Sequence, residues 1–290
     1  MGHTNGICSA AFNSAGTLLA TAEEGRPAVI RLWDFKGGAC VGILSGHERD
    51  IAAMHISADG RCLTAVGLDK AGRQAIVVWD ITRVLATSEA PVVVRHSTKY
   101  SVLSIKFSPF EEDHLVTCGR DSIRFYRLKN GRLRGCSINL GEHRQVAPEA
   151  RASLPPGTTH NTFTDIAFEV DYGLEKVEER HCFVASASGA VFQVNYGRRT
   201  LEAVFQLHNG PINSIIVNEG FCITGSDDRY LRMWPVDFSD YFLEAEHETP
   251  VTAVGVTPDG LAIAALTAGG SVGVLDVPSH RYRTLLRSHT

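Results

Sequence analysis

Two sets of polar side chains in this sequence have the residue types of a hydrolytic catalytic triad. Each set contains an imidazole, a hydroxyl and a carboxylate: His47, Thr64 and Asp69 in the first, and His208, Thr224 and Asp228 in the second. In a hydrolase, the imidazole and carboxylate together activate the hydroxyl as a nucleophile. An enzyme needs one such set, however, and neither threonine lies in the Gly-x-Ser-x-Gly turn that exposes a nucleophile. The repetition therefore favours buried hydrogen-bond networks, and we expect no catalytic residue.

Signals for a bound cofactor or metal are weak. Gly269-Gly270-Ser271-Val272-Gly273 is glycine-rich, but it lies between two expected strands and not before a helix. A hairpin turn is therefore favoured over a phosphate-binding loop, which needs a helix N-terminus. The remaining histidines do not have the spacing of metal ligands. We expect no cofactor, no metal ion and no small-molecule substrate.

The elements that would position these side chains form an internal repeat. Six segments each begin near a histidine: His3, His47, His96, His160, His208 and His247. Consecutive histidines in this series are 44, 49, 64, 48 and 39 residues apart. After each histidine comes an alternating apolar segment, typical of a strand. Turn sequences such as Ser57-Ala58-Asp59-Gly60 usually follow, and then a small-residue strand. Most units end in an apolar run with an aromatic residue, such as Leu231-Arg232-Met233-Trp234.

Four short strands in each of six units, with no helical periodicity, predict an all-β fold, a β-propeller with six four-stranded blades. The units are 1–45, 46–94, 95–140, 160–207, 208–246 and 247–290, with an irregular insertion at 141–160. The last residues, Ser288-His289-Thr290, would open a further unit. We therefore expect an excerpt of a longer protein. The sequence does not decide whether the ring of that protein has six or seven blades.

Composition excludes several classes of protein. The 290 residues are 44% hydrophobic and 21% charged, with a net charge of −4, which excludes disordered, collagen-like and coiled-coil chains. A charge-driven nucleic-acid partner is not expected. The first 22 residues lack charge, but polar residues interrupt them, so we expect no membrane or secretory segment. Seven dispersed cysteines indicate reduced thiols and a cytoplasmic location.

The motifs at the ends of the first two units resemble those of WD repeats. Gly2-His3 precedes Trp33-Asp34, and Gly46-His47 precedes Trp79-Asp80. The resemblance implies that each triad-like set is a structural tetrad tying the strands of one blade together, completed by Trp79 in the first set and Trp234 in the second. The opening units resemble the large WD-repeat proteins of centriole walls and basal bodies. His208-Asn209-Gly210-Pro211 through Gly225 resembles the propellers of echinoderm microtubule-associated-protein-like proteins.

Positive charge gathers in the third unit. Six residues form what we call the basic rim: Arg120, Arg124, Arg127, Lys129, Arg132 and Arg134. Arg132 and Arg134 alternate on the expected outermost strand, so they share one face. Such a field steers acidic partners, although charge on an edge strand also protects that strand from pairing with another chain. Both interpretations stay open at this point.

The sequence thus predicts a non-catalytic scaffold for protein partners. The resemblance implies a microtubule-associated protein of the cytoskeleton, at a centriole, basal body or cilium, with tubulin or a centriole-wall protein as partner. The alternative is a generic WD-repeat adaptor for a peptide or protein, such as a ubiquitin-ligase substrate receptor or a chromatin module. A propeller enzyme would need carboxylates or histidines that converge at the channel entrance.

Overall fold

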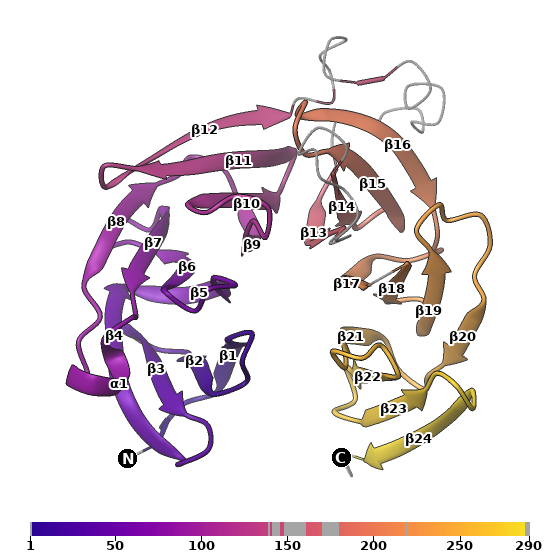
Figure 1. Ribbon diagram of the computed structural model, residues 1–290, viewed down its shortest axis with the longest axis horizontal. Helices are drawn as coiled ribbons and strands as arrows, with labels where there is room; N and C mark the ends of the chain where they lie inside the picture. Colours follow the sequence, from indigo (N-terminus) through magenta and orange to yellow (C-terminus); the bar gives the residue numbers. More distant parts are fainter. Residues whose placement is uncertain are drawn as a thin grey trace. The chain divides into compact units, whose positions relative to one another are not determined.

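The computed structural model describes residues 2–138, 140, 146–147, 161–169, 180–218 and 220–287. The chain divides into two compact units, Met1–Ser137 and Ile138–Thr290. Each unit contains three antiparallel sheets of four strands. Figure 1 shows these sheets, coloured along the chain from indigo to yellow.

The first unit is built from consecutive strands, so each sheet is one stretch of sequence. The first sheet comprises β1 (Ile7–Phe12), β2 (Leu18–Glu23), β3 (Ala28–Asp34) and β4 (Ala39–His47). The second comprises β5 (Arg49–Ile56), β6 (Cys62–Leu68), β7 (Gln74–Asp80) and β8 (Val92–Ser97), with the short helix α1 (Val84–Thr87) between β7 and β8. The third comprises β9 (Val102–Phe107), β10 (His114–Gly119), β11 (Ser122–Lys129) and β12 (Arg132–Ile138).

The second unit repeats this plan. Its first sheet comprises β13 (Phe163–Phe168), β14 (His181–Ser186), β15 (Ala190–Asn195) and β16 (Thr200–Gln206). The next comprises β17 (Ile212–Asn218), β18 (Phe221–Ser226), β19 (Tyr230–Pro235) and β20 (Leu243–Glu246). The last comprises β21 (Val251–Val256), β22 (Ala262–Thr267), β23 (Val272–Asp276) and β24 (Arg281–Leu286).

Turn chemistry explains why the first two strands of a sheet form a hairpin. Between β5 and β6, the Asp59 carboxylate accepts hydrogen bonds from the Ser57 hydroxyl at 2.5 Å and the Arg61 backbone N–H at 3.0 Å. Gly60 adopts a φ of +70°, a conformation that costs glycine little. The same arrangement recurs between β21 and β22. There Asp259 accepts hydrogen bonds from the Thr257 hydroxyl and the Leu261 backbone N–H. Each turn fixes the register of the strands that follow.

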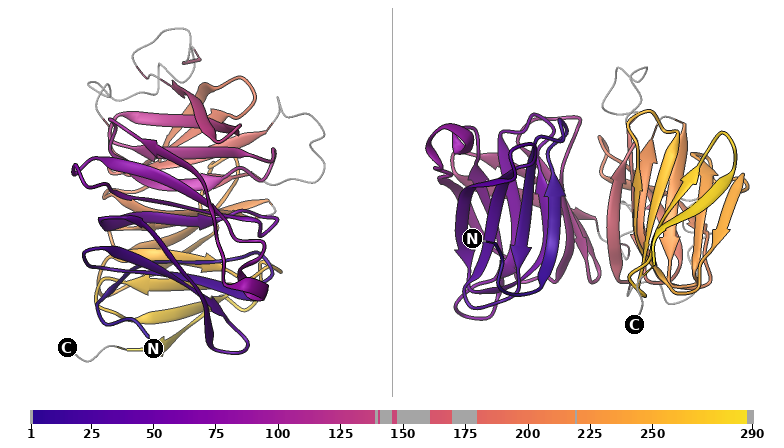
Figure 2. Two further views of the ribbon diagram at one scale, coloured as in Figure 1. Left: turned by 90° about the vertical axis from the view of Figure 1, so that its left-hand side faces the viewer. Right: turned by 90° about the horizontal axis from the view of Figure 1, so that it is seen from below.

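The core lies between neighbouring sheets, which stack face to face within each unit (Figure 2). In the first unit, Leu32 and Ile30 of the first sheet pack with Leu63 and Trp79 of the second. The opposite face of the second sheet packs against the third. Because both faces of an inner sheet are covered, strands such as β6 are apolar except for Thr64 and do not alternate with polar residues.

The expected all-β architecture of six four-stranded blades, a β-propeller, is confirmed by these six sheets. Most of the insertion at 141–160 lies outside the described residues. Val146 and Ala147 are described, and Val146 is buried and forms a parallel bridge with Leu201. No helix in the described ranges has the length and apolarity needed to cross a membrane.

Candidate functional site

The structure brings His208, Thr224, Asp228 and Trp234 into one hydrogen-bonded network. The His208 Nε2 atom lies 2.7 Å from the Thr224 Oγ1 atom, and Trp234 Nε1–H donates to the same oxygen at 2.9 Å. The His208 Nδ1 atom lies 2.9 Å from an Asp228 carboxylate oxygen. Asp228 also accepts the backbone N–H of Tyr230 at 3.1 Å. The network therefore ties the segment before β17 to β18, to the β18–β19 turn and to β19.

The partners determine where the protons lie. An ionised carboxylate only accepts hydrogen bonds, so His208 Nδ1–H donates to Asp228. His208 Nε2 then accepts from the Thr224 hydroxyl, which accepts in turn from the Trp234 indole. Burial lowers the pKa of His208 despite the neighbouring Asp228 carboxylate, so the imidazole is neutral at neutral pH. With its oxygen occupied by Trp234 and fully buried, Thr224 is not placed to act as a nucleophile.

His47, Thr64, Asp69 and Trp79 do not form the equivalent network. The Thr64 hydroxyl donates to the Val77 carbonyl at 3.3 Å, and Asp69 accepts backbone N–H groups of Ala71 and Arg73. The His47 ring makes an edge contact with Trp79 at 5.9 Å between centroids. His47 is 3% exposed, yet neither of its ring nitrogens has a hydrogen-bond partner in the described part of the chain.

Strand register explains this failure. In the fifth sheet Cys222 pairs with Trp234, so Thr224 lies two residues further along the same face. In the second sheet Leu63 pairs with Trp79, and the residue two positions further is Ala65. Ala65 accordingly packs in the same cluster as Trp79, whereas Thr64 lies on the opposite face of the strand. The assignment of Thr64 to the tetrad was therefore wrong by one residue, and Ala65 supplies no hydroxyl.

A second complete network lies in the first sheet and was missed from the sequence. The His3 Nε2 atom lies 2.6 Å from the Thr21 Oγ1 atom, and Trp33 Nε1–H donates to this oxygen at 2.7 Å. The His3 Nδ1 atom lies 3.0 Å from the Glu23 carboxylate. A signal for it exists, because Thr21 and Thr224 are both the fourth residue of the second strand of their sheet. The fourth residue of β6 is Ala65.

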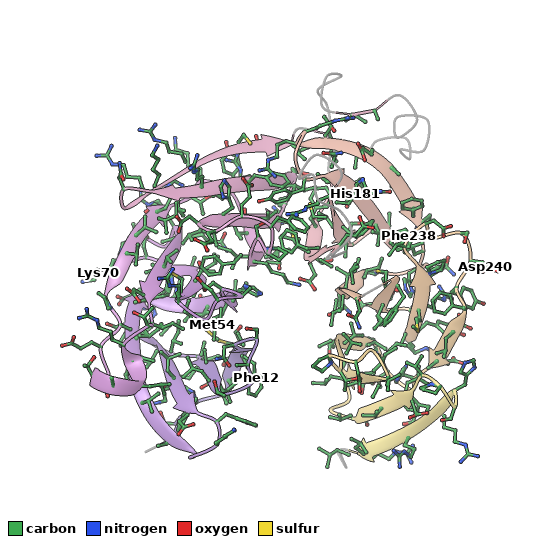
Figure 3. The ribbon with its side chains drawn as sticks, viewed as in Figure 1. Phe12, Met54, Lys70, His181, Phe238 and Asp240 are labelled. Carbon is green, nitrogen blue, oxygen red and sulfur yellow. The ribbon has the colours of Figure 1, made fainter. Side chains whose placement is uncertain are left out.

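Another histidine absent from the predicted sites, His181, lies between two carboxylates. Its Nδ1 atom is 2.7 Å from a Glu169 oxygen, and its Nε2 atom is 2.9 Å from a Glu202 oxygen (Figure 3). The hydrogen bond to Glu169 is the largest influence and raises the pKa of His181 above its ordinary value. No pattern in the sequence pairs these residues, since Glu169 and Glu202 lie far apart along the chain.

The basic rim divides into five exposed residues and one that is half-buried. Arg120, Arg127, Lys129, Arg132 and Arg134 are exposed, and none of them forms an ion pair with another described residue. Arg124 instead stacks on the Tyr100 ring, with its guanidinium carbon 3.2 Å from the ring centroid. Its Nε atom is buried without a hydrogen-bond partner in the described ranges. Arg124 is therefore engaged in a packing contact, and its part in partner binding stays a prediction.

Four of the five exposed cations lie on one hairpin. Strands β11 and β12 are joined by Asn130 and Gly131, whose φ angles are +50° and +67°, as a tight two-residue turn requires. This turn places Lys129 opposite Arg132, and Arg127 opposite Arg134. Like charges directly opposite each other on paired strands are destabilising. We call Arg127, Lys129, Arg132 and Arg134 the basic hairpin, and nitrogen-tipped side chains stand out from it in Figure 3.

Within the described ranges, no group of three or more His, Cys, Asp or Glu side chains is arranged to hold a metal ion. The seven cysteines are free thiols. Burial raises the pKa of Cys182 to about 12, so this thiol stays protonated at neutral pH.

Sequence comparisons agree with the fold. Residues 1–34, 38–80 and 199–235 match the WD domain, G-beta repeat family. A crystal structure of the Swd1 β-propeller domain from Myceliophteria thermophila superposes with a TM-score of 0.74 over 99% of this chain and 88% of that one. Its identity is 13%, so this likeness concerns the fold alone. The repeats, the sheets and the two networks identify the chain as a WD-repeat β-propeller.

Two of the similar proteins carry the names of centriolar or ciliary proteins. The chain is 46% identical over its whole length to centriole proteome protein 16 of Chlamydomonas reinhardtii, and 36% identical to WD repeat-containing protein 90 of Xenopus tropicalis. It is 25% identical over 90% of its length to cilia- and flagella-associated protein 251 of Chlamydomonas reinhardtii. The chain spans 14% and 16% of the lengths of the first two relatives and 34% of the third.

A hydroxyl at position 65 should complete the network of the second sheet. We expect Ala65→Ser to raise the free energy of unfolding by about 1 kcal/mol, because the new hydroxyl gives the buried His47 ring a partner. Urea denaturation of the 290-residue chain measures the change. The control Ala20→Ser buries a hydroxyl on β2 next to no orphaned imidazole, and should destabilise by about 1 to 2 kcal/mol. Equal destabilisation by both substitutions would contradict the register argument.

His47 and His181 should give stability opposite dependences on pH. Burial first, and then the nearby Arg95, lowers the pKa of His47 to about 4. The unfolded chain therefore binds the proton more readily, and about 3 kcal/mol of stability should be lost as the pH falls from 6.5 to 4. The raised pKa of His181 has the opposite effect on stability. The stability that His181 contributes is fully present below pH 6.5 and is lost as the pH rises through its pKa in the folded chain.

Urea titrations between pH 5 and pH 8 test both signs. His47→Gln should flatten the loss of stability on the acid side, and His181→Gln should flatten the loss on the alkaline side. A wild-type pH dependence retained in both variants would show that neither histidine carries it.

Proposed function

We propose that this chain is a non-catalytic scaffold for protein partners within a protein of the centriole, basal body or cilium. The names of the relatives support this location, and their names denote centriolar or cilium-associated proteins and not enzymes. The WD-repeat fold supports the scaffold role, because WD40 propellers generally serve as interaction domains. The His208 set forms a structural hydrogen-bond network and the His47 set does not assemble, so neither supports catalysis.

The basic hairpin is the docking element of this proposal, and it carries the argument. Lys129 faces Arg132 and Arg127 faces Arg134 without a counter-ion among the described residues, so the free chain retains their repulsion. An acidic partner surface would relieve it. The acidic surface of the tubulin lattice, or an acidic neighbour in the centriole wall, fits this requirement.

Exposed ion pairs contribute only about 0 to 1 kcal/mol each, so four cations acting together give a weak, salt-sensitive contact. Such a contact would give tight binding when other binding sites of the same protein engage the same partner at the same time. The proposed role is thus to orient one part of a multivalent attachment, and not to provide all of its affinity.

Co-sedimentation with microtubules across a salt series tests this function. The wild-type chain should pellet at low salt and lose binding as salt increases. Arg132→Glu with Arg134→Glu should abolish pelleting, because it reverses the charge on half of the hairpin. The matched control is Arg281→Glu with Arg283→Glu, which changes two exposed arginines of the same spacing on β24 and should leave pelleting unchanged.

Circular dichroism first verifies that all three proteins are folded. A folded wild-type chain that stays in the supernatant at low salt would contradict tubulin as the partner. Binding restricted to a short peptide and indifferent to microtubules would favour the adaptor role.

A further inference from the structure

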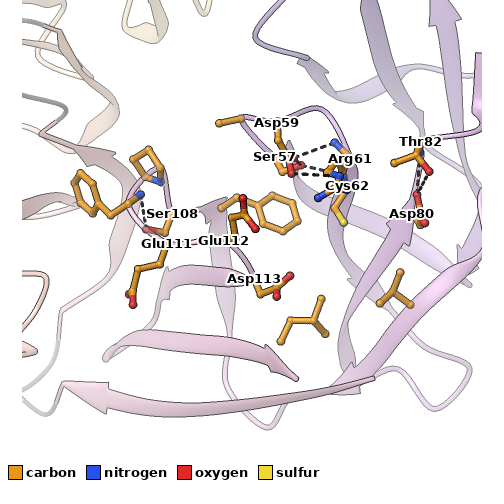
Figure 4. A pocket seen from close by; sticks show the side chains of 16 residues that line it. Ser57, Asp59, Arg61, Cys62, Asp80, Thr82, Ser108, Glu111, Glu112 and Asp113 are labelled. Carbon is orange, nitrogen blue, oxygen red and sulfur yellow. Dashed lines mark hydrogen bonds and ion pairs between the residues drawn. The ribbon is translucent and has the colours of Figure 1, made fainter. Parts of the chain in front are cut away.

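A cleft in the first unit, distinct from the basic hairpin, lies between the second and third sheets. It encloses about 590 Å³ and opens where the β5–β6 turn, the end of β7 and the β9–β10 turn meet (Figure 4). This volume falls within the range of about 300 to 1,000 Å³ that is usual for ligand sites. All of its lining residues belong to the described part of the chain.

The base of the cleft is apolar. Phe107 and Leu128 are buried at 7% and 9% exposure, and Cys62 and Val93 complete this surface. A partner side chain with an aliphatic stem would find a matching surface here, because long cationic side chains bury their methylene groups against apolar atoms.

The mouth of the cleft is strongly acidic. Five carboxylates line it: Asp59, Asp80, Glu111, Glu112 and Asp113. Arg61 is the one basic residue among the lining residues; its side chain is 66% exposed and its Nε atom lies 4.0 Å from the Asp59 carboxylate. Arg61 acts on Asp80 and on Cys62, but one cation offsets only part of the charge of five carboxylates.

The negative charge converges over the apolar base. Burial first, and then the carboxylates of Asp59, Asp80 and Asp113, raises the pKa of the Cys62 thiol to about 11. The three carboxylates come from the β5–β6 turn, the end of β7 and the β9–β10 turn, so their field reaches one point from several directions. A cation placed above Cys62 would interact favourably with all three.

Two of the carboxylates, Asp80 and Asp59, are held in place before any partner arrives. Asp80 Oδ1 accepts the Thr82 hydroxyl at 2.6 Å and the Thr82 backbone N–H at 2.9 Å. Asp59 is held by the turn contacts described above. Preorganised acceptors reduce the entropy lost on binding.

We propose that this cleft binds an arginine side chain from a basic segment of a partner protein, with the guanidinium between Asp80 and Asp113 and the stem against Phe107 and Leu128. Charge complementarity and the apolar base together favour arginine, because its planar fork can contact more than one carboxylate while its stem remains buried. This interaction surface differs in sign and place from the basic hairpin, so it does not depend on the proposed microtubule contact.

Fluorescence anisotropy with a labelled Ala-Arg-Ala-Arg-Ala peptide tests the proposal on the 290-residue chain. The peptide should bind saturably, and the same peptide with citrulline in place of arginine should bind about tenfold more weakly or worse, because it has lost the charge. Equal binding of the two peptides, or no saturable binding of the arginine peptide, would overturn the proposal.

A matched pair of variants locates the site. Asp80→Asn with Asp113→Asn removes two charges, and asparagine preserves the turn acceptor at 80 and tolerates the φ of +61° at 113. This variant should weaken binding about tenfold or more. The control, Asp237→Asn with Asp240→Asn, removes two exposed carboxylates, and Asp237 accepts the Ser239 hydroxyl and N–H just as Asp80 does with Thr82. An equal loss of peptide affinity in the two variants would show that the peptide is attracted non-specifically to acidic surfaces, and would contradict the proposal.

A chemical readout reports on the cleft itself. Saturating arginine peptide should slow alkylation of Cys62, measured by mass spectrometry, and leave alkylation of the exposed Cys40 unchanged. Unprotected Cys62 at saturation would place the peptide elsewhere and would reject the cleft.

Discussion

The alternation of side chains along each strand is the constraint on which the rest of this structure depends. Both faces of an inner sheet are covered, so a residue's place in the register decides which neighbouring sheet it contacts. Thr224 and Trp234 share one face and form a network with His208, whereas Thr64 faces away from Trp79 by a single residue. The same chemical types therefore produce a satisfied network in one blade and an orphaned imidazole in another.

The two proposed binding surfaces lie on loops and on an edge hairpin of these sheets. In the third blade, Leu128 lines the apolar base of the acidic cleft, while its neighbours Arg127 and Lys129 point to the other face of β11 and contribute to the basic hairpin. One strand thus contributes to two surfaces of opposite charge. This separation is favourable for a scaffold, because partners of different charge can be bound without competing for one site.

The period of the repeat was sufficient to predict the fold. A histidine and an alternating strand recur six times, mostly followed by a turn and an aromatic strand, and this pattern is typical of propeller blades. The details of the sites depended on information that a single sequence lacks. The spacing from His47 does not reveal whether Thr64 or Ala65 faces Trp79, because that depends on where β6 begins. Arg124 was assigned to the basic rim by charge alone, but its contact with Tyr100 links residues 24 positions apart. The acidic cleft was not predicted, because its carboxylates come from two turns and the end of a strand that lie apart in the sequence.

The central claim is that buried imidazole networks fix the blades and are structural in nature. The tautomers of the histidines test it most directly. In long-range nitrogen–proton NMR spectra of the labelled chain at neutral pH, His208 and His3 should each carry their proton on Nδ1, because each donates to a carboxylate while Nε2 accepts from a threonine. Protonation of either ring on Nε2 alone would contradict the network and, with it, the structural role assigned to the triad-like residues.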